Sequence, residues 1–318
     1  MTSVTLTNCS KDFRYPLFSV TYSMVFAVGL PLNAAGLWIF IRRLGLHTVP
    51  VIYMANLAMS DLLFTLSLPL RIIYFITARW HFGNTACRIP GMLFSVSLYS
   101  SSLFIMLISV DRLLALVYPL RSRALRTPTF AWLTCGLVWG IIMALSVPVA
   151  INHRATWDNN CNVLRCFEHY GKEEWTMGFY ILLVVTVMGI AIPFTVILGC
   201  TLTVIRKLRT ISCTMMNKNQ VICIFMGNLF IYSICFIPFH VAFILFGLQK
   251  VKWVSWTTDF FFAQTITMCL ASTNSCLDPL IYYITTKQIK RNNKTEATMM
   301  TTMTYRGLSW TGLEACSF

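Results

Sequence analysis

Hydrophobic positions in this chain run together in long stretches that are almost free of charge. Five of these stretches contain no charged residue, and two more are each interrupted by one aspartate. Each exceeds the roughly 20 residues that a helix needs to cross about 30 Å of hydrocarbon at 1.5 Å per residue. The seven stretches are Leu17–Ile41, Val49–Leu70, Ile89–Val110, Thr127–Asn152, Trp175–Ile205, Asn219–Gln249 and Phe260–Thr286.

This pattern predicts an all-α fold, a bundle of seven transmembrane helices. Irregular backbone cannot face lipid, so the stretches must be helices and the short polar joins must be loops. We expect residues 1–16 to form an extracellular N-terminus and 17–286 the transmembrane domain. Residues 287–318 then form a cytoplasmic tail that begins with a short amphipathic helix.

Composition and charge support a membrane protein and fix its orientation. Of 318 residues, 57% are hydrophobic and only 11% charged, which excludes ordinary cytosolic enzymes and disordered chains. The net charge of +14 would suggest nucleic acid for a soluble protein. If the N-terminus lies outside, however, the inner segments hold fifteen lysines and arginines against nine in the outer segments. The excess inside predicts an extracellular N-terminus and a cytoplasmic C-terminus, with no nucleic-acid partner.

The extracellular segments contain four cysteines in a setting where disulfides persist. Four cysteines allow three pairings, which the residues alone leave open. Asn8-Cys9-Ser10 is also an N-x-S sequon on this side, so Asn8 is a candidate for glycosylation. The four are Cys9, Cys87, Cys161 and Cys166.

Polar residues inside the predicted spans are the best candidates for function. An ionised aspartate in hydrocarbon costs about 3 kcal/mol or more, so Asp61 and Asp278 must face the bundle interior. Arg71 follows Asp61 by ten residues, about 15 Å along a helix, near the outer edge of the hydrocarbon. Its side chain either snorkels to lipid headgroups or binds a ligand phosphate, since a guanidinium matches phosphate oxygens bidentately.

A set of short motifs, one or more in each span, resembles the rhodopsin-like (class A) G-protein-coupled receptors. The resemblance covers nearly the whole chain and implies a multi-pass protein of the plasma membrane, not an enzyme. The motifs are Gly29 and Asn33, Leu57-Ala58-Met59-Ser60-Asp61, Cys87, Asp111-Arg112-Leu113, Trp139, Pro193, Cys235-Phe236-Ile237-Pro238 and Asp278-Pro279-Leu280-Ile281-Tyr282.

The resemblance implies roles for several residues. It pairs Cys87 with Cys166, which leaves Cys161 for Cys9. It implies an allosteric sodium ion and no other cofactor. The residues at this ion would be Asp61, Ser101, Asn274, Ser275 and Asp278. Those that it places in the switch for a heterotrimeric G protein are Asp111, Arg112, Phe236, Pro238, Asp278, Pro279 and Tyr282. Asp111 would hold Arg112 in the resting state, and arrestin and receptor kinases are further implied partners.

Within this family, the chain resembles the branch that holds purinergic nucleotide receptors and lysophospholipid receptors. Runs such as Ser67-Leu68-Pro69-Leu70-Arg71 and Phe236-Ile237-Pro238-Phe239-His240 resemble the lysophosphatidic acid receptors, type 5 first and type 6 next. Nucleotide receptors of this branch usually carry a basic residue three positions after the histidine. The corresponding Phe243 suits an acyl chain better than a triphosphate.

We therefore expect a receptor for an anionic lysophospholipid, with lysophosphatidic acid as the first candidate. A nucleotide receptor, a receptor for another lysolipid such as lysophosphatidylinositol, and a ligand scavenger that does not signal are the alternatives. The aromatic residues among the candidate contacts could equally be packing residues, and the loop cations could be solvated. The candidate ligand contacts are Arg71, Tyr22, Tyr74, Phe94, Tyr99, Arg165, His240, Phe243, Lys250 and Lys252.

Overall fold

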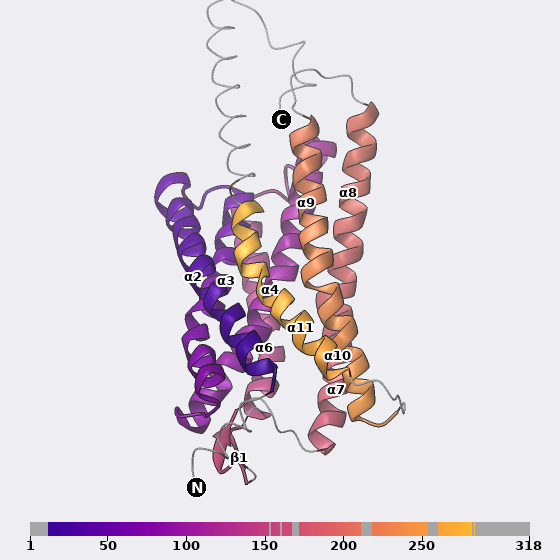
Figure 1. Ribbon diagram of the computed structural model, residues 1–318. Helices are drawn as coiled ribbons and strands as arrows, with labels where there is room; N and C mark the ends of the chain where they lie inside the picture. Colours follow the sequence, from indigo (N-terminus) through magenta and orange to yellow (C-terminus); the bar gives the residue numbers. More distant parts are fainter. Residues whose placement is uncertain are drawn as a thin grey trace, which may run out of the picture.

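The computed structural model is a helical bundle with a small hairpin at one end (Figure 1). It describes residues 12–152, 154–159, 161–166, 172–210, 218–253, 260–281 and 283. The helices are α2 (Arg14–Ile39), α3 (Val49–Thr77), α4 (Gly83–Val117), α5 (Pro119–Ser122), α6 (Pro128–Asn152), α7 (Lys172–Thr186), α8 (Ile192–Thr210), α9 (Lys218–Cys235), α10 (Ile237–Lys250) and α11 (Phe261–Ser272). Two π-helical segments, η1 (Phe40–Leu44) and η2 (Val187–Ala191), and two strands, β1 (Thr156–Asp158) and β2 (Val163–Arg165), complete the described elements.

The prediction of an all-helical transmembrane bundle is confirmed. Within the described residues, 6 continuous helical stretches are long and apolar enough to cross a membrane. They are α2 with η1, α3, α4, α6, α7 with η2 and α8, and α9 with α10. The seventh predicted stretch is also helical, but a turn at Thr273 divides it into α11 and a second piece over residues 274–281. Neither piece alone is long enough to cross, whereas the two in succession approach the required length.

Several helices continue beyond the predicted stretches into charged sequence. α2 begins at Arg14, α4 continues to Val117 and α8 continues to Thr210. A helix satisfies its own backbone groups in water as well as in lipid, and long basic side chains reach the headgroups, so a charged residue does not end it. The amphipathic helix predicted after residue 287 lies outside the described residues.

A two-stranded hairpin is the element that the sequence-based prediction missed. β1 and β2 pair antiparallel, with Thr156 opposite Arg165 and Asp158 opposite Val163. The backbone N–H of Trp80 donates to the carbonyl of Leu164 at 2.9 Å, which attaches the hairpin to the loop after α3. Strands of three residues are too short for a periodic pattern, and contacts with the bundle hold them in place.

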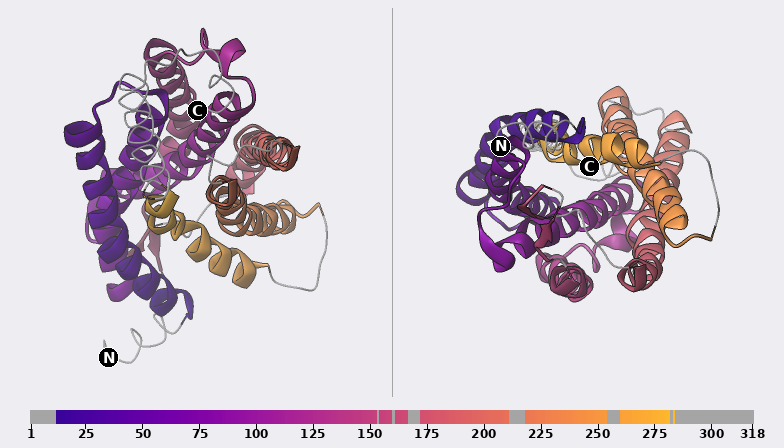
Figure 2. Two further views of the ribbon diagram at one scale, coloured as in Figure 1. Left: turned by 90° about the horizontal axis from the view of Figure 1, so that it is seen from above. Right: turned by 60° about the horizontal axis from the view of Figure 1, so that its bottom comes forward.

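Seen along the bundle, the helices form a ring in which α2 and α11 lie side by side, so the first and last spans close the bundle (Figure 2). α4 contacts α3, α6, α8, α9 and α11 and is therefore the central helix. The main hydrophobic core lies around it, with large side chains such as Phe104, Ile105 and Tyr232 completely or almost completely buried. Polar side chains enclosed in this core carry the candidate sites.

Proline produces one of the polar contacts between helices. Pro193 has no N–H to donate to the carbonyl of Gly189, the normal partner four residues earlier. This carbonyl lies in the π-helical segment η2, and the hydroxyl of Ser102 on α4 donates to it at 2.5 Å. The hydroxyl of Tyr232 on α9 donates to the carbonyl of Ile190 at 3.0 Å and lies 2.7 Å from the Ser102 oxygen. Three helices are thereby joined by buried hydrogen bonds.

Candidate functional site

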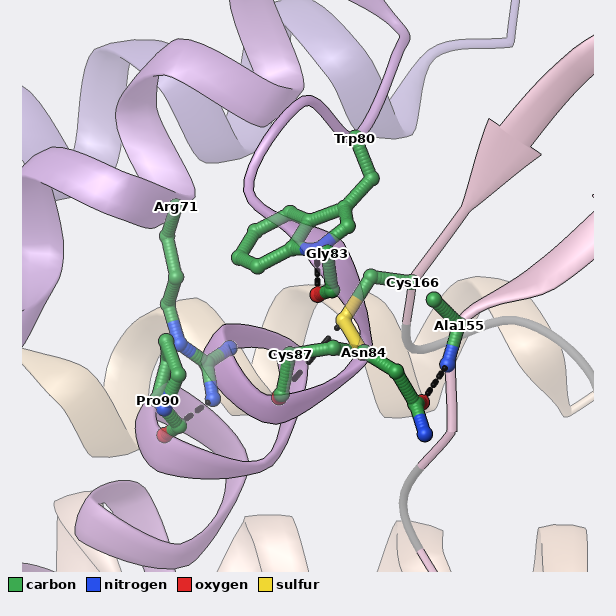
Figure 3. Close-up of a disulfide and its surroundings, with 8 residues drawn as sticks. All are labelled: Arg71, Trp80, Gly83, Asn84, Cys87, Pro90, Ala155 and Cys166. Atoms are coloured by element: carbon green, nitrogen blue, oxygen red, sulfur yellow. Dashed lines mark hydrogen bonds between the residues drawn. A yellow bond between two sulfur atoms is a disulfide. The ribbon is translucent and has the colours of Figure 1, made fainter.

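Arg71 lies inside the bundle, not at its lipid surface. Its side chain is 2% exposed, which contradicts the alternative that it snorkels to headgroups. Nη2 donates to the carbonyl of Pro90 at 2.9 Å, as Figure 3 shows, and Nη1 lies 3.5 Å from the Tyr22 hydroxyl. The guanidinium carbon is 5.6 Å from the centroid of the Tyr22 ring and 5.5 Å from that of Phe94. α2, α3 and α4 thus position one buried cation between two aromatic rings.

Aromatic contacts connect Arg71 with α10. The Phe94 ring packs edge-on against Phe239, with centroids 5.8 Å apart, and Phe239 packs on Phe243 at 5.5 Å. Phe94 and Phe239 are buried, and Phe243 is half-buried. Phe239, which joins the predicted contacts Phe94 and Phe243, was not a candidate. It follows Pro238 in sequence, but no motif signals that it faces the same region.

His240 and Tyr99, two of the predicted ligand contacts, touch each other. His240 Nε2 lies 3.3 Å from the Tyr99 hydroxyl, and His240 Nδ1 lies 2.9 Å from the carbonyl of Phe236. The Tyr99 ring leaves no space beside Gly189, where a Cβ would lie 2.8 Å from Tyr99 Cδ1. Glycine at position 189 therefore permits the close approach of α4 to η2.

Arg165 occupies a different place from Arg71. It lies on β2, is 3% exposed, and its Nε lies 3.3 Å from Asp158 Oδ2 in an ion pair. Its Nη1 donates to the hydroxyl of Tyr15 and, at 3.2 Å, to the carbonyl of Ala78. These partners come from the hairpin, from α2 and from the end of α3, so Arg165 joins three elements at the extracellular end of the bundle.

Three other candidates have described contacts with other residues. Tyr74 is buried among the aromatic side chains Tyr15, Phe75 and Trp80. Lys250 and Lys252 lie at the exposed end of α10, where Lys250 Nζ is 5.2 Å from the centroid of the Phe246 ring. Among the described contacts, neither lysine touches Arg71, Tyr22 or Phe94. The two lysines remain predicted contacts without structural support.

The extracellular disulfide implied by the resemblance is present. Cys87 at the start of α4 bonds to Cys166 directly after β2, with Cα atoms 5.9 Å apart (Figure 3). The side-chain oxygen of Asn84 also accepts a hydrogen bond from the backbone N–H of Ala155 at 2.9 Å. Cys161 is disulfide-bonded, but its predicted partner Cys9 and the predicted glycosylation site Asn8 lie outside the described residues.

A cluster of buried oxygen atoms occupies the middle of the bundle, where sodium was predicted. Ser97 and Ser101 donate to Asp61 Oδ1 at 3.4 and 3.3 Å. Asn274 Nδ2 donates to Asp278 Oδ2 at 2.8 Å, while Asn274 Oδ1 and Asp278 Oδ1 are buried without a hydrogen-bond partner among the described residues.

A cavity of about 10 Å³ adjoins this oxygen cluster, about the least that holds one water-sized particle. Its lining comes from α3, α4, α11 and the helical segment that follows α11. The lining residues are Phe64, Phe94, Ser97, Leu98, Ala271, Ser272, Asn274 and Ser275.

The cytosolic ends of α4, α8 and α9 pack together. Val204 and Leu208 of α8 pack with Val221 and Phe225 of α9, and half-buried side chains of α4 cover them. Arg112 lies at this end of α4, with Nε and Nη2 buried and without a hydrogen-bond partner among the described residues. The described contacts hold α8 and α9 against α4 at this end.

The ion pair beside Arg112 differs from the expected one. Asp111 Oδ1 pairs with Arg126 Nε at 2.9 Å and not with Arg112. Asp111 therefore has its counter-ion in the segment that follows α5 and not in its sequence neighbour. Tyr282, the predicted partner of Arg112 in the signalling state, lies outside the described residues.

The other switch residues lie in two places, at the junction of α9 and α10 and in the helical segment after Thr273. Phe236 is a buried turn residue between the two helices and stacks on Tyr232, with ring centroids 4.7 Å apart. Pro238 follows within the first turn of α10. Pro279 lies in the helical segment that follows Thr273, next to the buried Asp278. Both prolines interrupt backbone hydrogen bonding, which makes these points able to bend.

A bundle of membrane-spanning helices, a disulfide between the third span and the following extracellular loop, and the Asp111-Arg112 motif together define a class of membrane receptor. The family described as 7 transmembrane receptor (rhodopsin family) matches residues 32–282, and the chain belongs to it. It is thus a multi-pass protein of the plasma membrane and a receptor, not an enzyme.

Within this family, the chain is similar to several lysophosphatidic acid receptors. Lysophosphatidic acid receptor 6 of Gallus gallus is 36% identical over 287 residues, 87% of this chain and 93% of that protein. Lysophosphatidic acid receptor 4 of Homo sapiens is 36% identical over 88% of this chain and 77% of that protein. Lysophosphatidic acid receptor 5 of Mus musculus is 37% identical over 88% of this chain and 79% of that protein. The predicted resemblance to this group is confirmed, and these identities do not rank type 5 above type 6.

Proposed function

We propose that the protein is a receptor for an extracellular anionic lysophospholipid, lysophosphatidic acid in the first place, and that it activates heterotrimeric G proteins. The observation that supports this ligand is the position of Arg71. Its guanidinium lies in the bundle interior at the extracellular half, between the rings of Tyr22 and Phe94. A phosphate that reached it would gain charge-assisted hydrogen bonds in surroundings that contain little water.

The aromatic contacts beyond Arg71 favour a lipid over a nucleotide. Phe94, Phe239 and Phe243 extend an apolar surface from the cation, and an acyl chain could bury against it with about 25 cal/mol gained per Å². A triphosphate would require further cations near Arg71. Phe243 occupies the position where nucleotide receptors of this branch usually have one.

The names of the relatives support the same ligand class. Three receptor types that match most of the chain are each called lysophosphatidic acid receptors. Identity of 36–37% leaves the ligand itself open, so the assignment rests on the relatives and the Arg71 surroundings together. The acyl chain and the Gα subfamily are not part of the proposal.

Signalling would occur by a shift between two arrangements of the helices. Agonist binding favours an arrangement in which α9 moves away from α4 and α8, with the chain bending at Phe236 and Pro238. The groove that opens exposes Arg112 to the C-terminal helix of a Gα subunit. Arrestin and receptor kinases would act on the same cytosolic side after activation.

The buried oxygen cluster fits an allosteric sodium ion. Hard cations bind oxygen ligands, and two buried carboxylates that lie close together repel each other unless a cation or a proton is shared between them. Asp61, Ser101, Asn274, Ser275 and Asp278 would hold the ion, with the free Oδ1 atoms of Asn274 and Asp278 as the clearest ligands. Bound sodium would supply positive charge that stabilises the closed bundle.

A sodium titration tests this site without any agonist. The melting temperature of the purified receptor should rise with sodium chloride but not with choline chloride at equal ionic strength. Asp278→Asn should reduce this sodium-specific rise, while Cys135→Ala, in a buried position outside the cluster, should leave it unchanged. An equal rise in both salts would contradict the proposal.

A G-protein activation assay with a ligand panel tests the main proposal. The panel contains lysophosphatidic acids, lysophosphatidylinositol, ATP and UDP, each applied to cells with separate Gα reporters. Activation by lysophosphatidic acid but not by nucleotides supports the proposal. Activation by nucleotides alone would replace it with a nucleotide receptor, and lysophosphatidic acid binding without activation of any Gα would indicate a scavenger.

A further inference from the structure

The segment between α4 and α6, which is the second intracellular loop, supplies the counter-ion of Asp111. Arg126 Nε lies 2.9 Å from Asp111 Oδ1, and the Arg126 side chain is 29% exposed while that of Asp111 is 3% exposed. A nearly buried carboxylate is thus paired with a cation that remains accessible from the cytosol. Asp111 Oδ2 is buried without a hydrogen-bond partner among the described residues, so the carboxylate could accept another donor.

The fold of the loop determines where Arg126 lies. The short helix α5 follows α4 directly, and the Ser122 hydroxyl donates back to the carbonyl of Leu114 at 3.3 Å. The backbone N–H groups of Leu125 and Arg126 both donate to the carbonyl of Ser122, at 3.0 and 2.9 Å. Ser122 is 2% exposed. These bonds turn the chain back toward α4 and place the Arg126 side chain beside Asp111.

The ion pair also affects Arg112, the next residue on α4. Nε and Nη2 of Arg112 are buried without a hydrogen-bond partner among the described residues. Buried guanidinium donors without partners are costly, and an acceptor that reaches them relieves that cost. While Arg126 is paired with Asp111, these two N–H donors of Arg112 stay available to an acceptor from outside the chain.

We propose that Arg126 is a positioning residue for G-protein coupling, which pairs with Asp111 and so prevents Asp111 from capturing Arg112. This inference rests on the proposed function as a G-protein-coupled receptor. Loss of Arg126 would free the Asp111 carboxylate to turn toward Arg112 and hold it in the closed bundle. Loss of Asp111 as well would remove the competing carboxylate.

Four variants in nanodiscs, with purified G protein, test the pairing. Arg126→Gln should lower the rate of nucleotide exchange about tenfold, the size of a typical allosteric coupling. Arg126→Lys, which keeps the charge, should recover most of the rate. The double variant Arg126→Gln with Asp111→Asn should exchange nucleotide as fast as Asp111→Asn alone. Arg123→Gln is the matched control, since Arg123 is an exposed arginine of the same loop and should leave the rate unchanged.

Melting temperatures of the same variants provide a readout that needs no G protein. If Arg126 and Asp111 stabilise each other, the loss in the double variant should be smaller than the sum of the two single losses. Additive losses would overturn the pairing. A double variant as slow in exchange as Arg126→Gln would overturn the competition for Asp111, since Arg126 would then act by another contact. If wild type activates no Gα at all, the proposed function fails, and the melting temperatures still decide the pairing.

Discussion

Arg71 of α3 and Phe94 of α4 are in cation–π contact, with the guanidinium carbon 5.5 Å from the ring centroid. Both side chains are buried, so the attraction between cation and ring is weakened little by water. Phe94 also packs against Phe239 of α10. One ring therefore joins the candidate anion site to α10, the helix that follows the expected bend at Phe236 and Pro238.

Replacement of Phe94 by leucine should weaken agonist action without unfolding the bundle. Leucine retains apolar bulk but removes the ring from Arg71, a loss of about 0.5–2 kcal/mol. We expect agonist potency to fall by a few-fold to about 30-fold in a G-protein activation assay. Phe104→Leu is the control, because Phe104 is equally well buried but its described ring contact is with Trp139. Equal potency losses in both variants would contradict a role of Phe94 at the ligand.

Replacement of Ser102 by alanine should destabilise the closed bundle. The Gly189 carbonyl, to which Pro193 has no N–H to donate, would lose the Ser102 hydroxyl, at a cost of about 1–2 kcal/mol. The melting temperature should fall. Ser109→Ala is the control: it removes a hydroxyl of the same helix whose one bond among the described residues is to the Ile105 carbonyl, within that helix. A fall as large in Ser109→Ala would mean that the contact between helices contributes nothing.

Replacement of Arg165 by glutamine separates a structural role from a ligand contact. The substitution leaves Asp158 without this ion pair and removes the bonds to Tyr15 and Ala78, at a cost of about 2 kcal/mol. Surface expression and melting temperature should therefore fall, while agonist potency at the receptors that reach the surface should change by less than about threefold. Arg154→Gln, an exposed arginine of the same loop, should change neither. A large potency loss at unchanged stability would instead make Arg165 a ligand contact.

Spans, orientation and buried aspartates could be predicted from the sequence, because hydrocarbon imposes strict conditions on every residue that crosses it. Asp61 and Asp278 had to lie inside the bundle, and both are completely buried. The sequence left two positions open for the Arg71 side chain, the lipid headgroups and the bundle interior, since a helix near the membrane surface can direct a long cation to either. Only packing against Tyr22 and Phe94 decides between them.

Other features depend on contacts that no local pattern encodes. The pairing of Arg126 with Asp111 joins residues of two segments, whereas the motif suggested its sequence neighbour Arg112. The hairpin β1-β2 and the central place of Phe239 likewise result from tertiary packing. Arg165 was a candidate ligand contact from its charge and loop position, and its bonds to Asp158, Tyr15 and Ala78 could not be predicted from those two features.

Substitution of Arg71 tests whether this residue binds the phosphate of the ligand. Lysophosphatidic acid dose–response curves for G-protein activation should be measured for wild type, Arg71→Lys, Arg71→Ala and the control Arg154→Ala at matched surface expression. Loss of a guanidinium–phosphate contact should lower potency about 100-fold in Arg71→Ala and less in Arg71→Lys, because lysine keeps the charge but not the bidentate geometry. Arg154→Ala should match wild type. A wild-type response of Arg71→Ala to lysophosphatidic acid would contradict the claim that Arg71 binds the ligand phosphate.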